Sequence, residues 1–368
     1  PMHFRRVCLE SFGYTLPDEI VTTAELERRL APLYQRLRLP EGRLELMTGI
    51  RERRFFPPST RPSSVSIESA RRAIAASGID SHQFGALVHG SVCRDFLEPA
   101  TACRVHHGAG LPPEATIYDV SNACLGILNG IVQVANMIEL GQIRAGVVVG
   151  TECGRMLVEN TISQLNSDLS LTRESVKDFI ASLTIGSASA AVVLCDEELS
   201  QTGNRLTAAA VYCDTQHHDL CQSRGLETFM HTDSEELMRR GVAAGTATFK
   251  RFLGLAGWRP QHIDRTFCHQ VGVAHRKLMF ESLGLEPAID FATVETLGNT
   301  GAVALPITMA LGVDQGRLRP NDRVAMLGIG SGINCLMLAV EWKSNPARRA
   351  SEATKASSYA GALLGGTP

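Results

Sequence analysis

Residues 115–137 read ATIYDVSNACLGILNGIVQVANM and place a cysteine between a strand and a helix. Residues 115–118 are typical of a buried strand, and residues 127–137 are typical of a long helix. Cys124 therefore lies at a helix N-terminus, where free backbone N–H groups and the positive end of the helix dipole favour a thiolate. We expect its pKa to lie below the ordinary value of about 8.5. A small buried hydrophobe also suits this position, so the stretch alone leaves nucleophile and core filler open.

The composition describes an ordinary globular protein. The chain has 368 residues, of which 44% are hydrophobic and 20% charged, so a large core is expected. This length predicts two domains or one large duplicated domain. A net charge of −2 with mixed signs argues against nucleic acid or an anionic membrane surface as the main partner. We expect no membrane span and no secretion signal. Ten cysteines without framework spacing predict free thiols and a cytoplasmic location.

Strand and helix patterns alternate along the chain, which predicts a mainly parallel sheet covered by helices. We expect an N-terminal half over residues 1–204, a C-terminal half over 205–342 and a disordered tail over 343–368. The polar, His-rich residues 213–233 indicate a long loop. Strands are predicted at 86–92, 147–149, 190–194, 205–211, 266–268, 324–327 and 333–342. Helices are predicted at 23–37, 66–77, 122–140, 174–182, 234–255, 273–283 and 301–313.

Cysteine chemistry needs partners, and two segments offer them. A thiolate that accepts an acyl group needs a base or cation nearby and donors that hold the oxyanion. His269 follows a predicted strand, and strand ends in α/β sheets are where ligands bind. Asn299 lies in a turn, Gly298-Asn299-Thr300-Gly301, that opens a helix. Taken singly, the histidine also fits a structural role and the asparagine an ordinary turn.

Together these segments resemble the thiolase superfamily, and within it the ketoacyl synthase III-like branch. The resemblance covers about residues 3–342 and includes GIRERR at residues 49–54 and GIGSG at residues 328–332. It implies an α/β fold, a five-layered αβαβα sandwich made of two related halves. It also implies a homodimer.

The same resemblance implies roles for four residues. Cys124 would be the nucleophile. The side chains of His269 and Asn299 would donate hydrogen bonds to one thioester oxyanion. The backbone N–H groups of Cys124 and Gly332 would form a second oxyanion hole.

A further stretch, SVCRDFLEPAT at residues 91–101, is similar to the corresponding part of OleA-type enzymes, as are residues 121–125 and 327–335. Those enzymes join two fatty acyl-CoA chains head to head, and the glutamate at the position of Glu98 reaches into the partner's active site. A malonyl donor makes its carbanion by losing carbon dioxide. A plain acyl-CoA must instead lose an α-proton, so a carboxylate base becomes necessary. A surface acid before a proline is the structural alternative for Glu98.

The resemblance therefore implies an acyltransferase that carries out a non-decarboxylative Claisen condensation through an acyl-cysteine. The product would be a 2-alkyl-3-oxoacyl thioester, which hydrolysis converts to a β-keto acid. Coenzyme A thioesters would be the substrates, with no cofactor. Two alternatives stay open. One is a decarboxylating 3-oxoacyl-[acyl-carrier-protein] synthase III that uses acyl carrier protein and a malonyl donor. The other is acyl transfer to an alcohol or amine. The intact Cys124, His269 and Asn299 argue against a non-catalytic scaffold.

Three weaker patterns lie elsewhere in the sequence. Cys213, His217, His218 and Cys221 match no strong zinc spacing, so we expect no metal. The glycine-rich residues 328–332 precede a strand rather than a helix, which argues against a dinucleotide site. Arg51 and Arg53 are candidates for binding the phosphates of coenzyme A, although arginines near a turn are usually just solvated.

Overall fold

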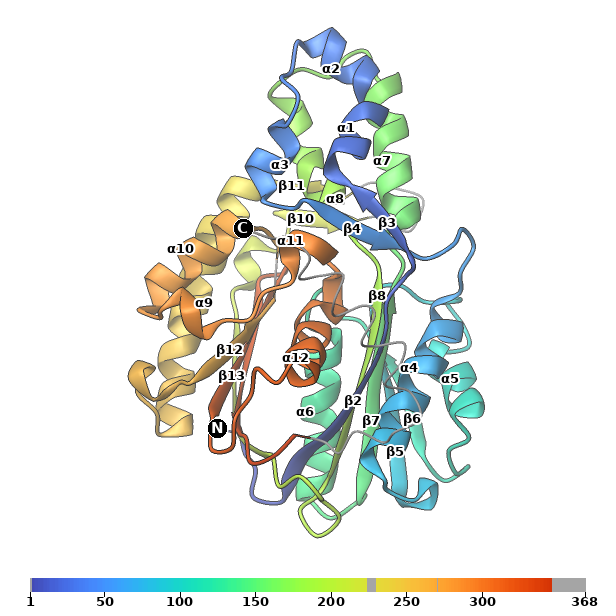
Figure 1. Cartoon of the computed structure of the whole chain (residues 1–368), viewed down its shortest axis with the longest axis vertical. Helices are drawn as coiled ribbons and strands as arrows, with labels where there is room; N and C mark the ends of the chain where they lie inside the picture. Colours follow the sequence, from blue (N-terminus) through green and yellow to red (C-terminus); the bar gives the residue numbers. More distant parts are fainter. Residues whose placement is uncertain (1, 224–229, 270, 346–368) are drawn as a thin grey trace.

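A ten-stranded mixed sheet forms the frame of the molecule (Figure 1). The computed structural model describes residues 2–223, 230–269 and 271–345. The strands of this sheet are β1 (Met2–His3), β2 (Val7–Thr15), β5 (Phe84–Gly90), β6 (Thr116–Val120), β7 (Ala145–Glu152), β8 (Ala188–Asp196), β9 (Arg205–Cys213), β12 (Arg265–Cys268), β13 (Arg323–Gly330) and β14 (Asn334–Glu341). They follow the order β12-β13-β14-β9-β2-β8-β7-β5-β6, with β1 paired to β9.

The strand pattern occurs twice. In the first half β2 pairs with β8, β8 is antiparallel to β7, and β7 is parallel to β5. In the second half β9, β14, β13 and β12 repeat these relations in the same order. The halves meet where Cys8 of β2 pairs with Arg205 of β9. The expected relation between the halves is thus visible in the topology. We propose that they divide between residues 204 and 205, where β9 begins.

Antiparallel pairings outnumber parallel ones, so the prediction of a mainly parallel sheet is wrong. Only β5 with β6, β5 with β7, and β12 with β13 run parallel among the described strands of this sheet. Every residue of β7 and β8 is buried. A strand buried on both faces gives one continuous apolar run whichever way its neighbours point. The hydrophobic pattern therefore locates these strands without giving their direction.

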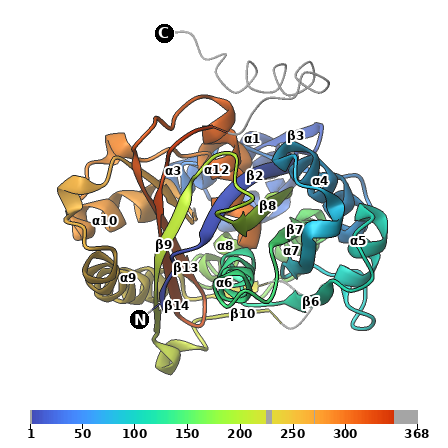
Figure 2. The ribbon, with the colours of Figure 1, turned by 90° about the horizontal axis from the view of Figure 1, so that it is seen from below.

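Helices complete five layers, which Figures 1 and 2 show from two directions. The helices α4 (Pro62–Ser77) and α5 (Thr101–Ala109) cover the outer face of the first half. The helices α9 (Ser234–Ala256) and α10 (Val273–Leu283) cover the second half. Between the halves lie α6 (Gly126–Glu139) and α12 (Ala304–Asp314). The expected αβαβα sandwich is confirmed.

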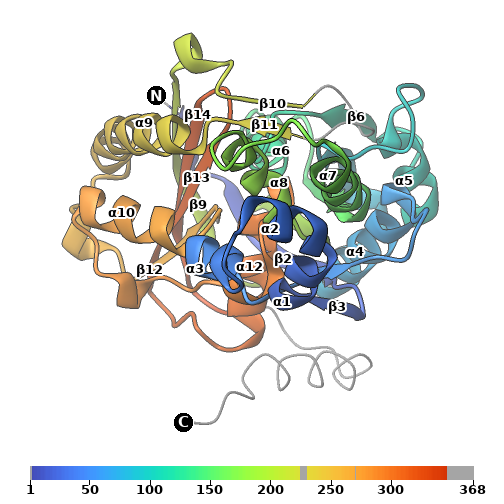
Figure 3. The same cartoon turned by 90° about the horizontal axis from the view of Figure 1, so that it is seen from above.

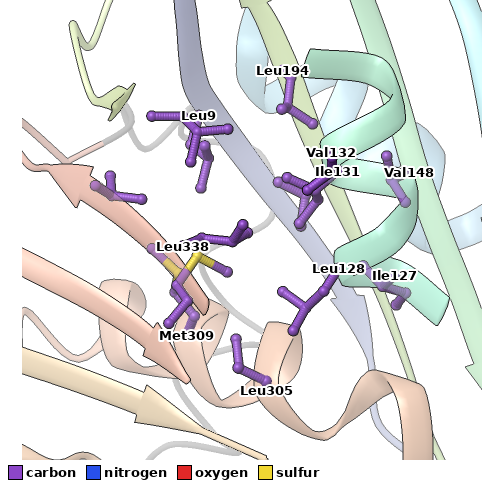
Figure 4. Close-up of a cluster of buried hydrophobic side chains, with 14 of the residues drawn as sticks. Leu9, Ile127, Leu128, Ile131, Val132, Val148, Leu194, Leu305, Met309 and Leu338 are labelled. Carbon is purple, nitrogen blue, oxygen red and sulfur yellow. The ribbon is translucent and has the colours of Figure 1, made fainter. Parts of the chain in front are cut away.

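The middle layer is apolar on all sides. Residues 304–312 of α12 are all buried, as a helix packed between two sheets requires. Figure 4 shows side chains from both central helices and from strands of both halves in one cluster. This cluster fixes α6, and with it the segment that carries Cys124.

A cap covers one end of the sandwich, at the top of Figure 1 and nearest the viewer in Figure 3. The predicted helix over residues 23–37 is broken at Leu30, because Pro32 starts a new helix. The predicted loop 213–233 contains a short strand pair, although residues 224–229 lie outside the described residues. The cap comprises α1 (Thr23–Arg29), α2 (Ala31–Leu37), α3 (Arg43–Thr48), α7 (Arg155–Ser167), α8 (Ile180–Leu183), the hairpin of β3 (Glu19–Thr22) with β4 (Glu52–Phe55), and β10 (Cys221–Ser223) with β11 (Met230–Thr232).

Two further expectations concern the ends and the surface. Most of the predicted disordered tail, residues 346–368, lies outside the described residues. Among the helices that the structure describes, none combines the length and the apolar character needed to cross a membrane.

The contact between Gly90 and Gly126 gives a stability prediction. A Cβ on Gly90 would lie 2.5 Å from the carbonyl carbon of Gly126, so Gly90→Ala must push α6 away from β5. We expect a loss of about 3 kcal/mol in the free energy of unfolding. Gly254→Ala is the matched control, because Gly254 lies in α9 with open space around it. The control should gain about 1 kcal/mol. Urea unfolding compares the two, and an unchanged midpoint for Gly90→Ala would contradict the close approach.

Candidate active site

A tight turn between β6 and α6 presents Cys124. The N–H of Leu125 donates to the carbonyl of Asn122 over 2.9 Å and closes the turn. Ala123, inside the turn, has a φ of 45°, in the left-handed region that costs a non-glycine residue about 1 kcal/mol. Such strain is common at active sites. The turn lifts Cys124 out of the strand and leaves it two residues before the first residue of α6.

The end of β13 lies directly against this turn. A Cβ on Gly330 would lie 3.4 Å from the Cys124 nitrogen and 3.5 Å from its Cβ. The Nδ2 of Asn334 donates to Oδ1 of Asn122 over 3.1 Å and to the carbonyl of Ser331 over 3.2 Å. These two bonds tie the loop that contains Gly332 to the nucleophile turn. The two backbone segments expected to form one oxyanion hole are therefore held together.

His269 reaches the same region through β13. Its N–H donates to the carbonyl of Leu327 over 3.1 Å, three residues before Gly330. Burial, with a smaller contribution from His275, lowers the pKa of His269 to about 3. The ring is therefore neutral at physiological pH. Its Nδ1 is buried without a hydrogen-bond partner. A neutral ring has one nitrogen free to accept a proton and one that can donate.

Asn299 occupies the turn between α11 (Val294–Leu297) and the start of α12. Its backbone is held at both ends: its N–H donates to Thr184 and its carbonyl accepts from Gly186, each over 2.9 Å. Its Oδ1 accepts from the N–H of Gly301 over 3.0 Å. With the oxygen engaged in that bond, the amide Nδ2 is the end left to donate to a substrate oxygen.

Glu152, the last residue of β7, is a site residue that the motifs missed. It is buried, and its carboxylate accepts the N–H of Ala302, three residues after Asn299, over 3.3 Å. Its charge also acts on Cys124 and raises the pKa of the thiol. The signal was present in the sequence. An acid that ends an apolar strand lies where α/β sheets bind ligands.

The expectation of a lowered pKa for Cys124 is wrong. Burial, with smaller contributions from Cys221 and Glu152, raises the pKa of the thiol to about 12. Removing water from a thiolate here outweighs the effect of the helix N-terminus. At neutral pH the free protein therefore holds a thiol, and attack on a thioester requires that a neighbouring base remove its proton.

Glu98 lies on the surface of the chain. It is exposed, in the loop over residues 91–100 between β5 and α5. Val92, Phe96 and Leu97 of the same loop are 47%, 51% and 92% exposed, so the loop that carries Glu98 also presents apolar surface. Single exposed apolar residues are normal, whereas a cluster of them indicates an interaction surface.

The two candidate arginines differ in position. Arg53 is fully buried, and its guanidinium donates to Thr23 over 3.0 Å and to the Leu183 carbonyl over 3.2 Å. Such a side chain cannot reach the phosphates of coenzyme A. Arg51 is 58% exposed, beside Glu295, and stays a candidate.

Cys213, His217, His218 and Cys221 do not gather around a metal position. In the part of the chain that the structure describes, no group of three or more histidine, cysteine or acidic side chains could hold a metal ion. Cys221 instead accepts a hydrogen bond from Thr232 over 3.4 Å.

Comparison with known proteins agrees with this geometry. Residues 47–194 match the thiolase N-terminal domain, and residues 253–342 match the C-terminal part of 3-oxoacyl-[acyl-carrier-protein] synthase III. A protein from Shewanella oneidensis named acyl-CoA:acyl-CoA alkyltransferase is 44% identical over 352 residues, which cover 93% of this chain and 100% of that protein. A protein of the same name from Xanthomonas campestris pv. campestris is 32% identical over 341 residues, which cover 93% of this chain and 100% of that protein.

The chain belongs to the acyl-CoA:acyl-CoA alkyltransferase family of the thiolase superfamily. A solved structure of Xanthomonas campestris OleA with bound lauric acid and lauroyl-CoA superposes on it with a TM-score of 0.88 at 31% identity. The superposition covers 92% of this chain and 100% of that one. The resemblance inferred from the sequence motifs is thereby confirmed, including its OleA-type branch.

The raised pKa of Cys124 gives a testable order of reactivity within this family member. Iodoacetamide reacts with thiolates, so at pH 7.5 Cys124 should be labelled more slowly than the exposed Cys213. The labelling rate of Cys124 should still rise above pH 9. Peptide-resolved mass spectrometry measures both cysteines in one sample. A Cys124 rate that exceeds that of Cys213 at pH 7.5 and stays flat up to pH 9 would contradict the raised pKa.

Proposed function

We propose that this protein joins two fatty acyl-CoA molecules head to head by a non-decarboxylative Claisen condensation. The observation that carries the proposal is the 44% identity, over the full length, to an acyl-CoA:acyl-CoA alkyltransferase. The lauroyl-CoA bound to the Xanthomonas relative supports fatty acyl-CoA as the substrate class. Two thioesters supply all the atoms of the product, so the condensation calls for no redox cofactor. All ten cysteines are free, which supports a reducing, cytoplasmic setting.

In the first half-reaction Cys124 attacks an acyl-CoA thioester. Neutral His269 accepts the thiol proton and passes it to the leaving coenzyme A thiolate, so the ring is neutral again and the acyl chain stays on the sulfur. The backbone N–H groups of Cys124 and Gly332 stabilise the oxyanion of the tetrahedral intermediate. The contact of β13 with the Cys124 turn supports this pairing of donors.

In the second half-reaction a second acyl-CoA loses an α-proton to Glu98. His269 and the Nδ2 of Asn299 donate to the enolate oxygen, and the carbanion attacks the carbonyl of the acyl-cysteine. The C–S bond then breaks, and the proton taken up by Glu98 restores the Cys124 thiol. The product is a 2-alkyl-3-oxoacyl thioester, and its hydrolysis gives a β-keto acid.

We infer that Glu98 acts in the site of a second copy of the chain. In one chain it is exposed, and the same loop exposes the apolar side chains of Val92, Phe96 and Leu97. Packing of this loop against a partner would remove that apolar surface from water and bring the carboxylate into a dry site. A homodimer is therefore part of the proposal.

The decarboxylating alternative requires a malonyl donor, whereas the proposed condensation does not. Purified protein should form coupled product from acyl-CoA alone, because Glu98 replaces decarboxylation as the source of the carbanion. Mass spectrometry of the products with and without malonyl-carrier protein separates the two reactions. Product that forms only when the malonyl donor is added would overturn the proposal.

Two variants test which half-reaction depends on Cys124 and which depends on Glu98. Cys124→Ala should release no coenzyme A from acyl-CoA, since the covalent step is lost. Glu98→Gln should become acylated at Cys124 but form coupled product at least a hundredfold more slowly, because a general base is missing. Glu114→Gln is the control, since Glu114 is an exposed acid outside the site. Normal coupling by Glu98→Gln would remove this residue from the mechanism.

A further inference from the structure

The carboxylate of Glu152 accepts three backbone N–H groups from two separate segments. Oε1 accepts from Val92 over 3.0 Å and from Ala302 over 3.3 Å, and Oε2 accepts from Cys93 over 3.1 Å. The residue is only 5% exposed. Glutamine has the same shape as glutamate, but its amide has one acceptor end and one donor end. Only the carboxylate of glutamate can therefore accept from all three N–H groups.

The first segment is the root of the loop that carries Glu98. Two further hydrogen bonds fix this root to the end of β7. Ser91 Oγ donates to the carbonyl of Thr151 over 2.7 Å, and the N–H of Cys153 donates to Sγ of Cys93 over 3.4 Å. The loop therefore starts from a rigid point, while Glu98 at its far end is exposed.

The second segment is the turn that carries Asn299. Gly301 donates to the Asn299 side chain, and the next residue, Ala302, donates to Glu152. Gly301 has a φ of 56°, and a Cβ on it would lie 3.2 Å from both Cγ and Oε1 of Glu152. The backbone of this turn therefore rests against the carboxylate, which fixes where the amide of Asn299 lies relative to β7.

We propose that Glu152 is a positioning residue for the second half-reaction. Its carboxylate holds the turn of the enolate donor Asn299 and the root of the loop that carries the base Glu98 in one fixed arrangement. This inference rests on the function proposed above. The arrangement has an electrostatic cost, because the negative charge of Glu152 contributes to the raised pKa of Cys124 and so disfavours the thiolate. Burying a carboxylate is also unfavourable unless it is hydrogen-bonded, which the three N–H groups provide.

The test compares Glu152→Gln with a matched control in the same chain. Glu10 of β2 is also a buried carboxylate that fixes a loop, through Ser200 over 2.6 Å, Gln201 over 2.9 Å and Thr202 over 3.0 Å. It does not contribute to the pKa of Cys124. Glu10→Gln therefore reports the effect of losing a buried loop anchor away from the site.

Single-turnover experiments with acyl-CoA measure coenzyme A release and coupled product separately. In Glu152→Gln the ratio of coupling to acylation should fall about a hundredfold, since small misplacements of reacting groups cost that much. The pH at which iodoacetamide labels Cys124 should move down, because a negative charge is removed. Glu10→Gln should lose thermal stability but keep both the ratio and the labelling profile.

Each other outcome has a distinct meaning. An unchanged ratio in a folded Glu152→Gln protein, or an equal loss in both half-reactions, overturns the positioning role. A wild-type protein that forms no product from acyl-CoA alone refutes the proposed function, and the labelling comparison still reports the charge of Glu152. If Glu152→Gln does not fold, Glu152→Asp keeps the charge but withdraws the oxygens. It should lower the ratio and leave the labelling profile in place, and an unchanged ratio there also overturns the proposal.

Discussion

The close packing of α6 against the sheet is the constraint on which the site depends. Gly90 and Gly126 bring the end of β5 and the start of α6 into backbone contact, and a Cβ on Gly130 would lie 2.5 Å from Val148 of β7. The opposite side of α6 packs into the apolar layer shared with α12, β2 and β14. The helix is thus held from both halves of the molecule. Its first turn, and Cys124 before it, cannot shift without moving both sheets.

Burial governs the chemistry of the groups placed there. It raises the pKa of Cys124 and lowers that of His269, so both groups are neutral before substrate arrives. A neutral thiol and a neutral imidazole form a suitable resting state for the proton transfer proposed for the first half-reaction. A dry site also strengthens the hydrogen bonds offered to an oxyanion. Glu98 is exposed in a single chain, and in the proposed function a partner chain completes the site.

The sequence predicted where strands and helices lie better than it predicted strand direction and the contacts between distant segments. Hydrophobic runs located most strands and helices, and the motifs around Cys124, His269 and Asn299 led to the family and to the layered fold. The sequence did not predict whether neighbouring strands run parallel or antiparallel. Strands that are buried on both faces show no alternation of apolar and polar residues, which would otherwise indicate an antiparallel sheet with one solvent-exposed face. Pro32 accounts for the break at Leu30, because proline suits the first turn of a helix and not its interior. The burial of Arg53 and the bonds of Glu152 depend on segments far apart in the chain, and no local pattern encodes such contacts.

The central claim is that one chain supplies the sulfur and its partner supplies the carboxylate. Mixing Cys124→Ala chains with Glu98→Gln chains tests it directly, since each variant alone lacks one group. About half of the dimers that form at random contain both variants, and each of those has one site with an intact cysteine and an intact partner glutamate. Coupling activity should therefore recover to about a quarter of the wild-type value. A mixture as inactive as its components, with mixed dimers verified by mass spectrometry, would contradict the account.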